Sequence, residues 1–115
     1  MAELTAYKVL TAVQLAELEH RGTFAGAPVD LADGYIHMST AAQLDGTVAK
    51  HFAGHDDLTI AAVDLDAFGE AVRWEPSRGG QLFPHLYGRL TLDSLLAYGP
   101  LEREGDGSIR LPTAG

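Results

Sequence analysis

The chain contains no cysteine, which excludes disulfide bonds, cysteine nucleophiles and cysteine-ligated zinc. It also lacks the roughly 18 consecutive apolar residues that a membrane span requires. Its first residues, MAELTAYKVL, do not place a basic segment before an apolar stretch, as a secretion signal would. These absences predict a cytoplasmic protein that is stabilised by packing and has no membrane association.

Basic residues are scarce. Eight lysines and arginines against sixteen acidic residues give a net charge of −8, and a surface of this sign repels phosphate backbones. General nucleic-acid binding is therefore not expected. The 115 residues, 46% hydrophobic and 21% charged, are typical of a single globular domain over residues 1–115.

Local patterns predict alternating short elements. Thr11 with Gln14, and Thr40 with Gln43, form capping signatures for two helices, and the run LTIAAVDL contains no strand breaker. The expected elements are strands at 5–10, 35–38, 58–65, 72–75, 96–104 and 108–111, helices at 11–20 and 40–52, and a helical turn at 91–96. Two helices near the start, followed mainly by strands, predict an α+β fold.

The segment Arg73–Gly88 concentrates residues that are typical of a binding site. It holds the only tryptophan, Trp74, and two prolines that lack the amide donor of a regular element. We expect an irregular loop that carries binding groups. In the alternative interpretation, this segment is a connector whose Trp74 and Phe83 fill the edge of the core.

The charge reverses around this segment. Arg73, Arg78 and Arg89 outnumber the single glutamate between residues 72 and 90, although the whole chain is acidic. Guanidinium groups bind phosphate or carboxylate through paired donors, so the pattern predicts a small anionic ligand. Alternatively, the arginines pair with nearby acidic residues.

Two motifs carry a resemblance to a known family. GYIHMST at 34–40, followed by a capped helix, and WEPSRGGQLFPHLYG at 74–88 resemble the bacterial family called domain of unknown function nine-five-two. The resemblance covers about residues 4–104. It implies the ADP-ribosyltransferase-like fold, a small split and mostly antiparallel sheet with two N-terminal helices, whose cleft holds NAD in the enzymes that share it. Fold membership alone does not establish an activity.

The resemblance assigns His37 and Ser39 to the first strand of the cleft. In NAD-using members of that fold, a histidine or arginine on this strand holds a ribose hydroxyl, and a serine or threonine two residues later holds the nicotinamide amide. Met38 departs from the pattern, because poly-ADP-ribose enzymes prefer glycine there, which allows close approach of the ligand. The structural alternatives are a core histidine bonded to backbone and a serine that caps the following helix.

Glu75 and His85 are the other candidates for catalysis. A glutamate late in the chain of such transferases contacts the nicotinamide ribose and stabilises a positively charged transition state. One branch of the fold, which includes the RNA 2′-phosphotransferases, uses a pair of histidines with basic residues instead. By resemblance, His85 would then act with His37.

Four further residues are predicted to contact the ligand. Arg78 and Arg89 could bind a pyrophosphate, and Trp74 or Tyr87 could stack on a flat ring, although either aromatic could equally be a buried anchor. We expect no metal. His51 and His55 have the spacing of metal ligands on a helix, but Gly54 ends the helix between them, and a site formed by His37, Glu75 and His85 has no local spacing to support it.

The leading hypothesis is a domain that binds NAD or a related nucleotide as substrate and transfers or hydrolyses an ADP-ribosyl-type group. One alternative is a module that binds a nucleotide or small anion without catalysis. Another is an interaction domain in which Trp74, Phe83 and Leu86 form a surface for an unidentified protein partner.

Overall fold

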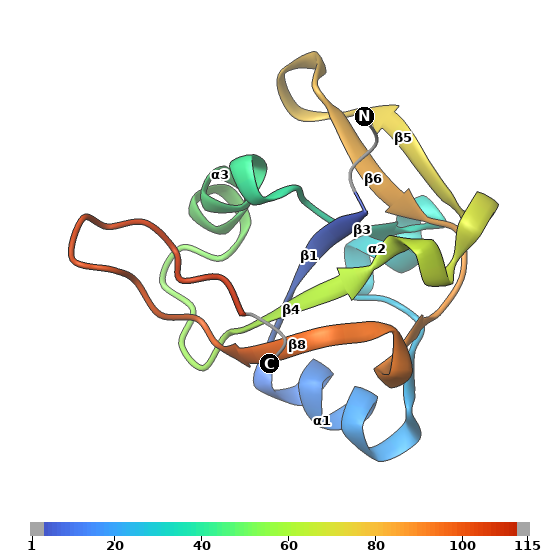
Figure 1. Cartoon of the computed structure of the whole chain (residues 1–115), viewed down its shortest axis with the longest axis horizontal. Coiled ribbons are helices and arrows are strands. Elements are labelled where there is room, and N and C mark those ends of the chain that lie inside the picture. The colour runs from blue at the N-terminus through green and yellow to red at the C-terminus, as the bar shows by residue number, and fades with distance from the viewer. Residues whose placement is uncertain (1–3, 113–115) are drawn as a thin grey trace.

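The computed structural model describes residues 4–112 as two small sheets, a short ribbon and three helices (Figure 1). The α-helices and strands are β1 (Thr5–Leu10), α1 (Ala12–Arg21), β2 (Thr23–Phe24), α2 (Pro28–Asp33), β3 (Ile36–His37), α3 (Ala41–His51), β4 (Thr59–Asp64), β5 (Val72–Pro76), β6 (Leu82–Leu86), β7 (Leu90–Thr91) and β8 (Leu95–Pro100). No helix within residues 4–112 has the length and apolar character needed to cross a membrane.

Every strand pair in the sheets is antiparallel. The orders are β1-β4-β8 and β3-β6-β5, with β2 and β7 forming a separate ribbon. The two larger sheets meet where the amides of Tyr7 and Ser39 each donate to the other residue's carbonyl, at 2.7 and 2.9 Å. The α+β, mostly antiparallel prediction is confirmed. A third helix, α2, was not expected because Gly26-Ala27-Pro28 suggests a loop.

The sheet β1-β4-β8 is covered on both faces, which explains why β4 is almost entirely buried. One face contributes Ala61 and Val63 to a core that includes Leu18 of α1, and the other contributes Ile60 to a core that includes Leu44 and Val48 of α3. Figure 1 shows α1 and α3 on different sides of these strands. Strand β4, formed by the unbroken apolar run LTIAAVDL, is the central strand of this sheet.

Both predicted capping boxes are present. The Thr11 hydroxyl accepts from the amide of Gln14 at 3.3 Å, and the Gln14 side chain accepts from the amide of Thr11 at 3.0 Å. Thr40 and Gln43 form the same reciprocal pair at 3.2 and 3.1 Å. The boxes satisfy amide groups that have no partner within the helix, so these two helix starts are set locally.

The expectation of an irregular loop at 73–88 is wrong, because β5 and β6 occupy most of it. Pro84 lies in the middle strand, paired with Trp74 of β5. Its carbonyl accepts from the amide of Met38 at 3.1 Å, so its nitrogen also points toward β3 and not toward β5. Because Pro84 has no amide hydrogen, a donor is missing on the side of β3, at the position where β3 ends. The hydrogen bonds between β5 and β6 are not affected.

The C-terminal prediction also needs correction. Strand β8 ends at Pro100, and the expected strand at 108–111 is reduced to a single bridge between Arg103 and Ile109. Leu101, Ile109 and Leu111 pack against the core beside α3. Burial of these side chains holds the segment without an extended ladder.

Leu86 and Leu82 of β6 provide a matched test of the core. Leu86 is fully buried and Leu82 is 52% exposed. We expect Leu86→Ala to lower the free energy of unfolding by about 2 to 5 kcal/mol and Leu82→Ala by less than about 1 kcal/mol. Urea denaturation followed by circular dichroism measures both, and equal losses would contradict this placement of β6.

Candidate functional site

His37 and His85 lie opposite each other on neighbouring strands. They are register partners in the β3–β6 ladder, and their ring centroids are 5.4 Å apart. Successive side chains of a strand point to opposite faces. Ile36 and Met38, on either side of His37, and Leu86, next to His85, belong to the core. The Met38 side chain therefore points away from the histidines, which form one polar face of the small sheet.

The carboxylate of Asp30, on α2, anchors His37. It accepts four hydrogen bonds, from Lys8 Nζ at 2.9 Å, the Ala27 amide at 2.8 Å, the His37 amide at 3.0 Å and His37 Nδ1 at 2.6 Å. Burial raises the pKa of Asp30, but the bonds from His37 and the charge of Lys8 outweigh burial and lower this pKa from 3.8 to about 2. The carboxylate is therefore ionised near neutral pH.

Lys8 completes this buried network. Its ammonium group donates to Asp30 and also to the carbonyl of His37 at 2.9 Å. Burial lowers the pKa of Lys8, while the charge and hydrogen bond of Asp30 oppose that effect. The pair thus links β1 to β3 through charges that stabilise each other.

The second nitrogen of His37 faces another carboxylate. Nε2 lies 2.9 Å from Oδ2 of Asp33, whose side chain is 44% exposed. Because carboxylates only accept, the Asp30 contact is a hydrogen bond from Nδ1, and the Asp33 contact is an ion pair when the ring is protonated. A ligand that bonds to Nε2 must therefore displace Asp33, which is exposed enough to move.

Glu75 orients His85 in a similar way. Its Oε1 lies 2.8 Å from His85 Nδ1 and accepts a 2.7 Å bond from the hydroxyl of Tyr87. The Tyr87 and His85 bonds lower the pKa of Glu75 below its usual value, although burial opposes them. Tyr35 stacks on the His85 ring at 4.1 Å between centroids. These contacts define the orientation of the imidazole.

The other nitrogen of His85 is the unusual group. Nε2 is buried, and no described residue bonds to it. With Nδ1 donating to Glu75, Nε2 of a neutral ring is an acceptor. Because an unpaired buried polar atom is costly, this nitrogen indicates a position for a ligand or a water molecule.

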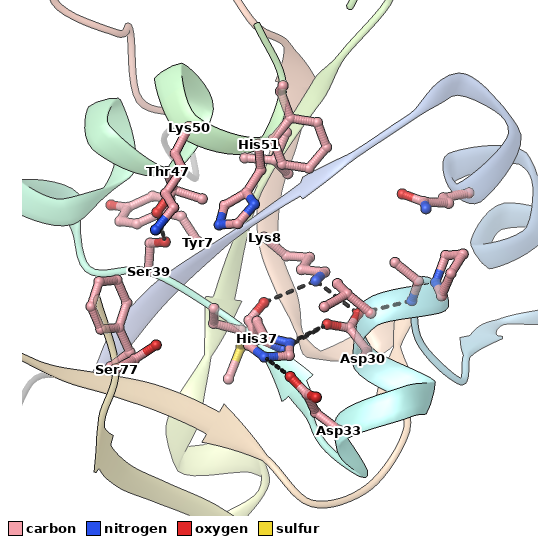
Figure 2. A pocket seen from close by; sticks show the side chains of 18 of the residues that line it. Tyr7, Lys8, Asp30, Asp33, His37, Ser39, Thr47, Lys50, His51 and Ser77 are labelled. Carbon is pink, nitrogen blue, oxygen red and sulfur yellow. Dashed lines mark hydrogen bonds and ion pairs between the residues drawn. The ribbon is translucent and has the colours of Figure 1, made fainter. Parts of the chain in front are cut away.

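Both histidines line a cavity of about 540 Å³ between α2, α3 and the two sheets (Figure 2). This volume falls within the range that binds small molecules and cofactors. Ser39 also lines it, but its hydroxyl bonds to that of Thr47 at 2.7 Å, and Thr40 caps α3 instead. The structure thus brings together three of the predicted site residues, His37, His85 and Ser39.

Among the other predicted residues whose side chains the structure describes, Trp74, Glu75, Tyr87 and Arg89 do not line the cavity. Glu75 reaches it only through His85. Tyr87 and Arg89 are exposed, and Arg73 lies over the Tyr87 ring at 4.8 Å. The Arg78 side chain lies outside the described part of the structure. The positive charges at the cavity come instead from Lys8 and Lys50, with His51 and His55 nearby.

Trp74 packs against the core on the opposite face of β5 from Glu75. The proposed interaction surface of Trp74, Phe83 and Leu86 is not available, because Phe83 and Leu86 are buried and Trp74 is partly buried. Within residues 4–112, no group of three or more histidine and acidic side chains is placed to hold a metal.

Asp30, Lys8 and Lys50 were not predicted from the sequence to belong to the site. Asp30 is the third residue after Ala27, where its side chain can accept a hydrogen bond from the Ala27 amide. An acidic residue in the first turn of a helix that begins at a proline is the local signal that could have predicted this contact. The contact of Asp30 to Lys8 joins distant parts of the chain, and neither this contact nor the one to His37 follows a helix or strand repeat.

Asp30 should make the free energy of unfolding depend on pH. A carboxyl with a lowered folded-state pKa stabilises the fold above its unfolded pKa, and loses this effect as pH falls from about 4 toward 2. Asp30→Asn should therefore unfold more easily than the wild type at pH 7, by about 3 to 5 kcal/mol because Lys8 loses its partner. The deficit should shrink by about 2 kcal/mol toward pH 2.

Denaturation at a series of pH values measures this difference. Asp33→Asn is the control, since the exposed Asp33 contact should contribute less than about 1 kcal/mol. A deficit for Asp30→Asn that stays constant from pH 7 to pH 2 would contradict the assignment.

The chain was compared with known proteins. Residues 9–98 match the model of a family described as protein of unknown function (DUF952). The crystal structure of protein CC0527 from Caulobacter crescentus is similar, with 39% identity, a TM-score of 0.83 and coverage of 92% of this chain and 93% of that one. The solution NMR structure of CC0527 shows 38% identity, a TM-score of 0.78 and coverage of 93% and 91%. No curated protein matches.

Proposed function

Because the chain belongs to the DUF952 family, whose function is not defined, we propose its function from its own cavity: it binds NAD or a related nucleotide beside His37 and His85. The observation that carries the proposal is the cross-strand histidine pair at the cavity, with His85 Nε2 buried and without a partner in the described part of the chain. A ligand hydroxyl donating to Nε2 would satisfy this atom.

The arrangement of the site supports a ligand rich in hydroxyl groups. The exposed carboxylate of Asp33 supplies oxygens that accept from hydroxyls, and His37 can donate. The two sheets meet at Tyr7 and Ser39, and residues of both line the cavity, which supports the proposed resemblance to the ADP-ribosyltransferases. That resemblance makes NAD the first nucleotide to test.

The geometry also suits hydrolysis of the nicotinamide ribosyl bond. In this reaction, a water oxygen forms a bond to C1′ of the ribose, the C1′–N bond breaks, and nicotinamide leaves with the bonding electrons. His85 Nε2 would take the proton of the attacking water, and Glu75 would stabilise the resulting imidazolium through Nδ1. Transfer follows the same course with an acceptor hydroxyl in place of water.

His37→Asn should weaken NAD binding about tenfold, because it removes Nε2 but retains a donor that can reach Asp30. Isothermal titration calorimetry with NAD and ADP-ribose measures the change. His20→Asn on α1 is the matched control, since His20 does not line the cavity. If the wild type binds neither compound at millimolar concentration, nucleotide binding is excluded.

Turnover is tested separately. Mass spectrometry of wild-type protein incubated with NAD should detect nicotinamide and ADP-ribose, or an ADP-ribosylated acceptor. His85→Asn should lower the rate about a hundredfold, because it removes the base but can still donate to Glu75. Binding without any turnover would support the alternative of a nucleotide-binding module without catalysis.

A further inference from the structure

The cavity has two chemically different sides (Figure 2). On one side the carboxylate of Asp33 lies at His37, while the charge of Asp30 is paired with Lys8. On the other side, Ser39 and the α3 residues Thr47, Lys50 and His51 contribute hydroxyl groups and basic groups. A ligand with one anionic end therefore meets repulsion at the first side and attraction at the second.

The basic side is built from one face of α3. Lys50 and His51 follow Thr47 by three and four residues, so both project from the same side of the helix as Thr47. Ser39 joins them through its 2.7 Å bond to Thr47, whose hydroxyl also lies 3.2 Å from the carbonyl of Gln43. When Thr47 donates to Ser39, the Ser39 proton is available to a ligand. Figure 2 shows the Lys50 side chain extending from α3 toward Ser39 and Thr47.

Lys50 differs from Lys8, the other lysine at the cavity. The ammonium of Lys8 is committed to Asp30 and to the carbonyl of His37. Lys50 is exposed, and its last-turn position on α3 brings its charge to the cavity without a carboxylate contact among the described residues. Its donors are therefore available to a ligand.

We propose that Ser39, Thr47 and Lys50 form a phosphate subsite, with His51 beside it, and that the sugar hydroxyls of the ligand lie at His37 and Asp33. The orientation rests on the proposed nucleotide function. This subsite assigns anion recognition to α3 in place of the arginines around 73–89. The expected ligand is a phosphorylated sugar or nucleotide in preference to an unphosphorylated nucleoside.

Two titrations test the subsite. In ¹H–¹⁵N spectra of the wild type, sodium pyrophosphate should shift the amides of residues 39, 47, 50 and 51 more than those near Arg73 and Arg89. Lys50→Gln should weaken binding of pyrophosphate and ADP-ribose about tenfold and leave adenosine binding unchanged. Arg21→Gln, an equal loss of charge on α1 outside the cavity, should change neither.

The outcomes separate this subsite from the proposed function. Nucleotide binding that depends on His37 but responds equally to Lys50→Gln and Arg21→Gln overturns the subsite and leaves the function standing. Pyrophosphate shifts centred on residues 73–89 also overturn it. Pyrophosphate binding on α3 without any nucleotide binding supports the subsite and excludes the proposed function.

Discussion

The buried carboxylate of Asp30 connects β1 with α2 and β3. It accepts from Lys8 on β1, from the start of α2 at Ala27 and from His37 on β3. Gly26 allows this approach, because a Cβ there would lie 2.8 Å from the Asp30 Cβ and its φ of 133° favours glycine. Ionised and fully bonded, Asp30 holds Lys8 as its counterion in the interior.

This constraint also determines the chemistry of the cavity. Each site histidine contacts a carboxylate through Nδ1, His37 through Asp30 and His85 through Glu75. Such pairing sets the orientation of an imidazole and favours one protonation pattern. The two rings nevertheless differ, because Asp33 contacts Nε2 of His37 while Nε2 of His85 has no partner among residues 4–112. His37 is thereby suited to hold a ligand and His85 to accept a proton.

Features encoded by nearby residues could be predicted from the sequence. The capping boxes at Thr11 and Thr40 involve partners three residues away, and the buried strand β4 is an unbroken apolar run. The strand expected at 72–75 corresponds to β5. Strand β6 could not be recognised, because Pro84 excludes a regular strand unless its nitrogen faces a position that needs no donor. That position exists only because β3 ends beside Pro84.

The sequence by itself determined the α+β class, the two capped helices and the family, since these depend on local pattern and on motifs. His37, His85 and Ser39 were also predicted as site residues from the sequence motifs, and the fold brings them to one cavity. The tertiary structure alone decided that Trp74 belongs to the core, that Arg89 lies away from the cavity, and that Lys50 provides a positive charge there. Strand register and burial set which side chains share a surface, and both arise from contacts between residues distant in the chain.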